Sequence, residues 1–213
     1  MKLYYPLMLD LKARKCLIVG GGLVAERKIG SLLVAGAAIT VVSPDFTAAI
    51  EAKGSSGELV LHRRIYDSED IQGFSLVIAA TDLAHVNKQI AQDASKEGIW
   101  VNVVDQPELS SFIVPSVVRR GKLTLSVSTG GASPGTARRI AAELESAYGQ
   151  EYEIYLDFLS EMRLKVQDTV KDRQSRQTIF KQMLDWDVLE KIRNGTFTAW
   201  RQEKLDSFEQ DST

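Results

Sequence analysis

Three consecutive glycines stand between an apolar run and a run of helix-forming residues in "KCLIVGGGLVAERK". Gly20, Gly22 and Ala25 match the spacing G-x-G-x-x-A. Between a strand and a helix, these positions permit a tight turn, the approach of a pyrophosphate to the backbone and close packing of the helix on the sheet. The helix would offer the backbone N–H groups of Leu23 and Val24 to an anion. The pattern predicts a dinucleotide site, although a glycine turn needed only for backbone geometry is an alternative.

A side chain that binds the adenosine ribose is expected where the next strand ends, about twenty residues beyond the glycines. Here the strand ends in "VVSPD", with Ser43 at the tip, then Pro44 and then Asp45. Either Asp45 bends back past Pro44 to the ribose, or Ser43 and the local backbone meet it. No basic residue adjoins this tip, and a ribose 2′-phosphate would require one, so the pattern favours NAD over NADP.

A later strand ends in "AATD", which places small side chains beside the expected cofactor crevice. Thr81 is a polar member of this group, and we predict that it borders the cofactor. Ordinary packing within a sheet accounts for small residues at this position equally well.

Short apolar runs alternate with amphipathic segments from residue 15 to about residue 105, as in a parallel sheet covered by helices. Right-handed crossovers between such strands give an α/β fold, a Rossmann-type doubly wound parallel sheet. This sheet would hold the glycine turn and the polar strand ends together at its carboxyl edge. The predicted strands are "CLIVG", "AITVVS", "ELVLHRR", "SLVIAATD" and "IWVNVVD".

Beyond this sheet, "SFIVPSVVRRGKLTLSVSTGG" predicts two extended runs joined around residues 119–121. A helix is expected to begin at Ser133 and Pro134, which are a favourable N-cap and first helical residue. From residue 150 the pattern is helical, with a polar tail over 202–213 that is predicted to fray. We expect an NAD-binding Rossmann domain over 1–112, a small α+β segment over 113–148 and a helical domain over 149–213.

The composition limits the partners and the compartment. The chain has 213 residues, of which 26 are basic and 28 acidic, so a net charge of −2 supplies no global field for nucleic acid. The single cysteine, Cys16, excludes an intrachain disulfide and fits a reducing compartment. No run of about 18 apolar residues is present, so we expect a cytoplasmic protein without a membrane partner. His62 and His85 are isolated, and no metal site is predicted.

Five motifs in order, "VGGGLVAERK", "AATD", "NVVD", "SFIVPS" and "STGGASP", resemble the precorrin-2 dehydrogenase and sirohydrochlorin ferrochelatase family, the dehydrogenase part of sirohaem synthesis. The resemblance extends over about residues 7–144. It implies that NAD accepts a hydride from precorrin-2, which gives sirohydrochlorin. It also implies a homodimer, with residues 113–148 as the dimerisation segment.

Asp105 of "NVVD" matches the catalytic aspartate of the family. The resemblance implies that its carboxylate is the general base that removes a proton as the hydride leaves. Asn102, three residues earlier, is expected to support the substrate site. Considered without the resemblance, an aspartate that caps a loop explains Asp105 equally well.

The substrate that the resemblance implies is rich in carboxylates, so its site should supply cations and hydrogen-bond donors. The expected substrate-binding residues lie beyond the first domain, where a solvated basic face and strand-end hydroxyl groups are the alternatives. They are Arg119, Arg120, Ser128, Thr129 and Arg138, with Lys122 and Arg139 as further candidate cations.

These residues are compatible with three hypotheses about the function. A dehydrogenase that acts alone or with a separate chelatase partner is favoured, since the chain lacks room for the methyltransferase domain that is fused to this unit in some relatives. A bifunctional dehydrogenase and ferrochelatase is the second. The third is a module that binds NAD or a tetrapyrrole without catalysis.

Overall fold

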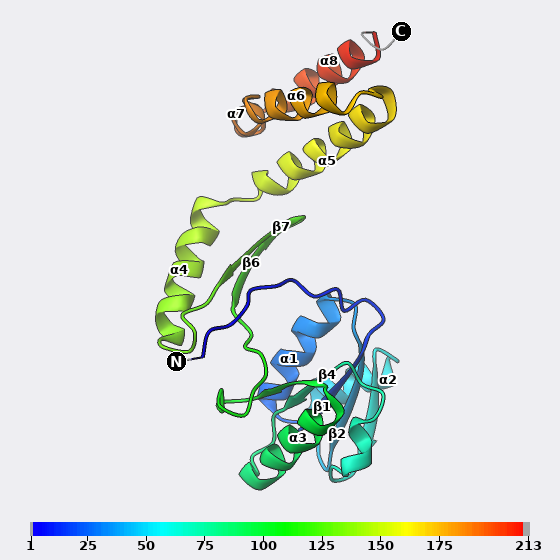
Figure 1. The fold of residues 1–213 in the computed structure, drawn as a ribbon, viewed down its shortest axis with the longest axis vertical. Coiled ribbons are helices and arrows are strands. Elements are labelled where there is room, and N and C mark those ends of the chain that lie inside the picture. The colour runs from blue at the N-terminus through cyan, green and yellow to red at the C-terminus, as the bar shows by residue number, and fades with distance from the viewer. Residues whose placement is uncertain (1, 211–213) are drawn as a thin grey trace. The chain divides into compact units, whose positions relative to one another are not determined.

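The computed structural model describes residues 2–210, and the chain divides after Val114 into two compact units. The first unit is an open sheet with strand order β3-β2-β1-β4-β5, in which every pair of neighbours is parallel (Figure 1). Its strands are β1 (Lys15–Val19), β2 (Ala38–Ser43), β3 (Leu59–Arg63), β4 (Leu76–Ala79) and β5 (Trp100–Val103). The predicted Rossmann-type fold class is confirmed.

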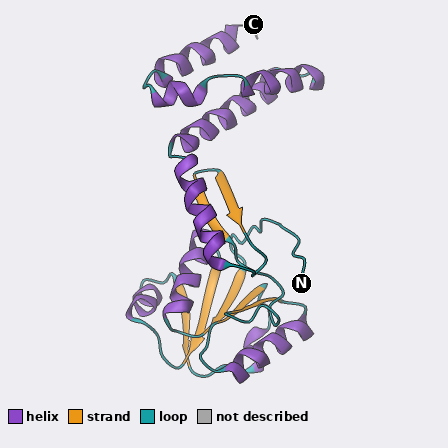
Figure 2. Cartoon of the chain, turned by 90° about the vertical axis from the view of Figure 1, so that its left-hand side faces the viewer, coloured by secondary structure: helices purple, strands orange, loops and turns teal. Residues whose placement is uncertain are grey.

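Helices cover both faces of this sheet, as Figure 2 shows. Alternate residues of each strand point to opposite faces, so Cys16 and Ile18 pack with α1 and α2, whereas Leu17 and Val19 pack with α3. Strands that are buried on both faces read as continuous apolar runs, which is why the sequence predicts them well. The helices are α1 (Leu23–Val34), α2 (Ala48–Ser55), the 3₁₀ helix η1 (Ser68–Ile71) and α3 (Ala84–Glu97).

The strand order reverses between β1 and β4, because successive strands are added first on one side of β1 and then on the other. In open α/β sheets a ligand binds at the carboxyl ends of the strands beside such a switch point. The glycine turn follows β1 directly, so the fold puts it at this position.

The second unit begins with the antiparallel hairpin of β6 (Ser116–Arg120) and β7 (Leu123–Val127), against which α4 (Pro134–Ala147) packs. Val118, Ala137 and Ala141 are buried between these elements. The side chain of Ser133 accepts a hydrogen bond from the backbone N–H of Thr136, so α4 begins where the sequence predicts.

The remaining helices of this unit share a second core, in which Phe158 contacts the rings of Trp186, Phe197 and Trp200. The expected fraying of the tail from residue 202 is wrong up to residue 210, because α8 continues to that point; residues 211–213 lie outside the described residues. The division of this unit near residue 148 stays a prediction. The helices are α5 (Glu151–Thr169), α6 (Arg173–Leu184), α7 (Val188–Arg193) and α8 (Phe197–Gln210).

Candidate functional site

The glycine turn after β1 is pressed against the ends of two neighbouring strands. Gly20 has a φ of 118°, and a Cβ at this residue would lie 2.3 Å from the carbonyl oxygen of Ala80. A Cβ at Gly21 would lie 1.9 Å from the carbonyl oxygen of Asp45. Both positions therefore require glycine for the fold itself, as the alternative based on backbone geometry expects.

Gly22 differs from its two neighbours. Its φ of −86° and ψ of −175° suit any residue, and a Cβ built there would meet nothing within 4 Å. Gly22 is also the N-cap of α1, and no side chain caps this helix. The first backbone N–H groups of α1, including those of Leu23 and Val24, therefore donate to no capping side chain and can bind a ligand. Open space above an uncapped helix N-terminus fits a dinucleotide pyrophosphate.

The end of β2 lies beside this turn, with Ser43 and Asp45 in contrasting environments. Ser43 is only 7% exposed, and its Oγ lies 2.9 Å from the place that a Cβ of Gly21 would occupy. The side chain of Asp45 is 99% exposed. The backbone N–H of Thr47 donates to the carbonyl oxygen of Gly21 at 2.9 Å, which ties this segment to the glycine turn.

The sequence-based expectation that no basic residue adjoins the end of β2 is wrong, because Arg63 of β3 lies beside it in the sheet. Arg63 is paired with Ser43 in the parallel register of β2 and β3. Its Nη1 donates to the carbonyl oxygen of Pro44 at 3.4 Å and lies 3.9 Å from Oδ1 of Asp45. Twenty residues separate these positions in the chain, and only the sheet register brings them together.

At the end of β4, Thr81 is fixed by a buried asparagine that the sequence reasoning missed. The Oγ1 of Thr81 donates to Oδ1 of Asn87 at 2.7 Å, and Nδ2 of Asn87 donates to the carbonyl oxygen of Thr81 at 2.9 Å. A polar residue on the apolar face of a predicted helix is the signal that could have identified Asn87. These bonds hold Thr81 between β4 and α3, at the carboxyl edge of the sheet.

Asp105 lies two residues beyond β5, in the turn at the same edge of the sheet. It has a φ of 59°, a left-handed conformation that aspartate adopts more readily than most residues. The neighbouring Val104 N–H donates to the carbonyl oxygen of Ala79, so the turn remains attached to β4. An exposed carboxylate in a strained turn at the ligand-binding edge suits a role in catalysis.

Two lysines interact with the turn that contains Asp105, one through its charge and one through hydrogen bonds. Burial and the charge of Arg27 lower the pKa of Lys28, whereas the charge of Asp105 raises it, so the ammonium and carboxylate groups interact. The Nζ of Lys2 donates to the carbonyl oxygens of Pro107 and Glu108 at 3.0 Å and of Ser110 at 3.2 Å. Neither lysine was identified from the sequence, because both are far from this turn along the chain.

Asn102 is 8% exposed, and its Nδ2 donates to the carbonyl oxygen of Phe112 at 3.1 Å. Ser111 also bonds to β5, because its Oγ accepts from the N–H of Val101 at 2.8 Å. In the structure Asn102 therefore ties the segment after Asp105 to β5.

The other expected substrate-binding residues belong to the second unit. Arg120 has a side chain that is 12% exposed and donates to the backbone and carboxylate of Glu145. Ser128 and Thr129 accept from backbone N–H groups of the loop before α4. Arg119 and Arg138 are exposed.

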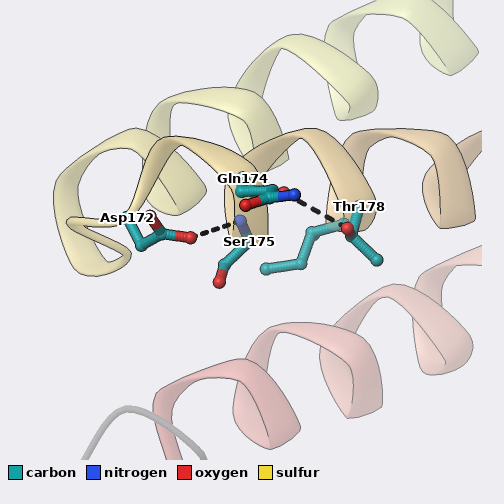
Figure 3. Close-up of a pocket in the computed structure, with 5 residues that line it drawn as sticks. Asp172, Gln174, Ser175 and Thr178 are labelled. Carbon is teal, nitrogen blue, oxygen red and sulfur yellow. Dashed lines mark hydrogen bonds between the residues drawn. The ribbon is translucent and has the colours of Figure 1, made fainter.

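A hollow in the second unit lies beside the start of α6 (Figure 3). Asp172 accepts from the N–H of Ser175 at 2.7 Å, and Thr178 donates to the carbonyl oxygen of Gln174 at 3.2 Å. The first bond caps the N-terminus of α6 and the second joins a side chain to the backbone within this helix, so neither indicates a ligand.

Among residues 2–210, there is no group of three or more His, Cys, Asp or Glu side chains that could hold a metal ion. Within the same residues, no helix is long and apolar enough to cross a membrane.

Comparisons with known proteins show which family the chain resembles. The sequence model of an NAD(P)-binding family matches residues 7–116, the part that contains the glycine turn and Asp105. A solved structure of SirC, a precorrin-2 dehydrogenase, superposes with a TM-score of 0.81 and 31% identity, over 97% of this chain and 100% of that one. The chain belongs to the precorrin-2 dehydrogenase family. The predicted nicotinamide dinucleotide cofactor is thereby confirmed. The enzymes of this family are oxidoreductases.

Longer relatives share most of the chain. The siroheme synthase of Methylococcus capsulatus is 37% identical over 192 residues, which are 90% of this chain and 40% of that protein. The siroheme synthase of Chromobacterium violaceum is 37% identical over 200 residues, 94% of this chain and 43% of the relative. The chain thus spans about two fifths of the length of these curated relatives.

Proposed function

We propose that the protein is an NAD-dependent precorrin-2 dehydrogenase, which forms sirohydrochlorin in sirohaem biosynthesis. One observation carries the proposal: the carboxyl edge of one sheet holds an open, uncapped glycine turn after β1 and an exposed carboxylate after β5. A sensor that only binds a dinucleotide needs the turn but no base. The likeness to SirC over almost the whole chain supports the choice of substrate.

In this proposal the first N–H groups of α1, including those of Leu23 and Val24, bind the pyrophosphate, with Gly22 leaving the space for it. Asp45 accepts hydrogen bonds from the adenosine ribose, since its carboxylate is exposed whereas Ser43 is buried. Thr81 borders the nicotinamide end. When bound, NAD supplies the acceptor for a hydride from the substrate.

Asp105 is the proposed general base, which takes the proton that the substrate loses as its hydride leaves. Its place at the carboxyl edge, two residues beyond β5, matches the location of ligands in open α/β sheets. Arg119 and Arg138, which are exposed, are proposed to bind substrate carboxylates together with Ser128 and Thr129. Arg120, which is bound to Glu145, and Asn102, which is buried, are proposed to contribute to substrate binding by positioning the neighbouring residues of their own units.

The proposal includes a homodimer joined through residues 113–148 and a cytoplasmic location. Iron insertion is assigned to a separate chelatase partner. The alternative is a bifunctional enzyme, and ferrous iron with purified sirohydrochlorin in the absence of NAD separates the two. Metallation faster than the uncatalysed control supports the bifunctional enzyme.

The test of Asp105 uses Asp105→Asn, because asparagine also tolerates the left-handed φ and keeps the turn intact. We expect turnover of precorrin-2 to fall about 10²- to 10⁴-fold, the contribution typical of a general base. Glu108→Ala removes another exposed carboxylate from the same turn and should leave turnover unchanged. Unchanged turnover in Asp105→Asn contradicts the assignment.

A further inference from the structure

Arg63 occupies the corner between the ends of β2 and β3, where two carboxylates and an aromatic ring surround it. Its Nη2 donates to Oε1 of Glu51, and its Nη1 lies 3.9 Å from Oδ1 of Asp45. The guanidinium carbon lies 5.1 Å from the centre of the Phe46 ring. One cation therefore faces two carboxylates, and the corner carries a net charge of −1.

This corner lies where the adenosine end of a dinucleotide is expected, because the segment after β2 contacts the glycine turn. The carbonyl oxygen of Asp45 blocks the Cβ position of Gly21 at 1.9 Å. NAD and NADP differ only in the phosphate on the adenosine ribose, and an arginine near this strand end is the group that accommodates that phosphate. The guanidinium of Arg63 can bind a phosphate, but it already donates a hydrogen bond to the carboxylate of Glu51.

We infer that Glu51 is a specificity-determining residue, which selects NAD over NADP by occupying the guanidinium of Arg63. This inference rests on the proposed dinucleotide site. A phosphomonoester carries a charge of about −1.5 to −2 at neutral pH, so it meets two carboxylates and one engaged cation at this corner. The ribose hydroxyl groups of NAD carry no charge and avoid this repulsion.

The local structure keeps Glu51 in place. Glu51 lies in the first turn of α2, whose N-cap is Thr47; the Oγ1 of Thr47 accepts from the N–H of Ile50 at 3.3 Å. The same hydroxyl donates to Glu26 of α1 at 2.6 Å, which ties α2 to the helix that follows the glycine turn. The Arg63 and Glu51 side chains are 56% and 48% exposed, so a ligand can reach them and the fold depends little on their ion pair.

The experiment measures dissociation constants for NADH and NADPH from nicotinamide fluorescence, without substrate. The variants are Glu51→Gln, the double variant Glu51→Gln with Arg63→Met, and the control Glu58→Gln. Glu58 forms a comparable exposed ion pair with Lys53 at 3.4 Å, away from the corner. All the changes are at exposed positions, and thermal melting checks that each variant is folded.

We expect the wild-type protein to bind NADH more tightly than NADPH. Glu51→Gln should tighten NADPH binding about tenfold, the gain from one charge-assisted arginine–phosphate contact, with little change for NADH. The double variant should lose this gain, and Glu58→Gln should behave as the wild type. If Glu51→Gln binds NADH normally and NADPH as weakly as the wild type, or if the double variant keeps the gain, the role of Glu51 is overturned. Failure of the wild-type protein to bind either dinucleotide overturns the proposed function itself.

Discussion

Replacing Gly22 by alanine separates the binding role of the glycine turn from its structural role. The backbone at Gly22 is already in an extended conformation that alanine adopts, and the added Cβ meets no protein atom within 4 Å. Alanine is a poorer N-cap than glycine, which lowers the free energy of unfolding by about 0.5–1 kcal/mol. Alanine also restricts the unfolded chain, which raises the free energy of unfolding by about 0.4–1 kcal/mol. The free energy of unfolding should therefore change by less than about 1 kcal/mol.

Dinucleotide binding should respond very differently, because the new methyl group occupies the space through which the pyrophosphate reaches the first N–H groups of α1. We expect the affinity for NADH to fall by at least about tenfold, equivalent to ~1.4 kcal/mol. Urea unfolding measures the first quantity and a fluorescence titration with NADH the second.

Two other glycines provide the comparison. Gly30→Ala makes the same chemical change on α1 at an open position, so it should stabilise the protein by up to about 1 kcal/mol and leave NADH affinity unchanged. Gly20→Ala would place a Cβ 2.3 Å from the carbonyl oxygen of Ala80 at a φ of 118°, and should destabilise the fold by about 2–5 kcal/mol. Wild-type NADH affinity in a folded Gly22→Ala protein would refute the reasoning.

Three further outcomes follow from the buried and bonded groups of the first unit. Cys16 is fully buried, and burial raises the pKa of its thiol to about 11, so alkylation at pH 8 should require denaturant; rapid labelling of the native protein contradicts this. Burial raises the pKa of Asp93, but hydrogen bonds from Ser68, Lys96 and Tyr66 outweigh it, so the folded-state pKa lies below the ordinary value of 3.8. This contribution to stability is present above that pH and is lost as the pH falls through the folded-state pKa, so Asp93→Asn should cost about 1–3 kcal/mol at pH 7 and nothing in strong acid. Lys2→Met should speed hydrogen exchange of residues 105–111 more than Lys2→Arg does, and equal protection in both variants argues against the Lys2 contacts.

The first unit is well predicted from sequence because β1, β2 and β4 are almost entirely buried and read as apolar runs, and the glycine turn follows β1 directly. The N-cap of α4 is equally well predicted from sequence, because its signal consists of two adjacent residues, Ser133 and Pro134. Contacts set by sheet register are different: no local pattern places Arg63 beside Ser43, and the preference for NAD was argued without that contact.

Other features depend on tertiary structure in the same way. Asp105 adopts a positive φ, which the motif "NVVD" does not predict. Lys2 donates a hydrogen bond to the same turn, although more than a hundred residues separate it from Pro107 in the chain. The polar tail from residue 202 forms part of α8, because Leu205 is buried in the core of the second unit and Lys204 lies over the rings of Trp186 and Trp200. Composition alone gave the wrong expectation for that segment.

The central claim is most directly tested by anaerobic incubation of the purified protein with precorrin-2 and NAD, followed by absorbance of both products. We predict that NADH and sirohydrochlorin form in equal amounts, because each hydride lost by the substrate is gained by the dinucleotide. Tight binding of NAD and precorrin-2 without formation of NADH would contradict the account and leave a binding module in its place.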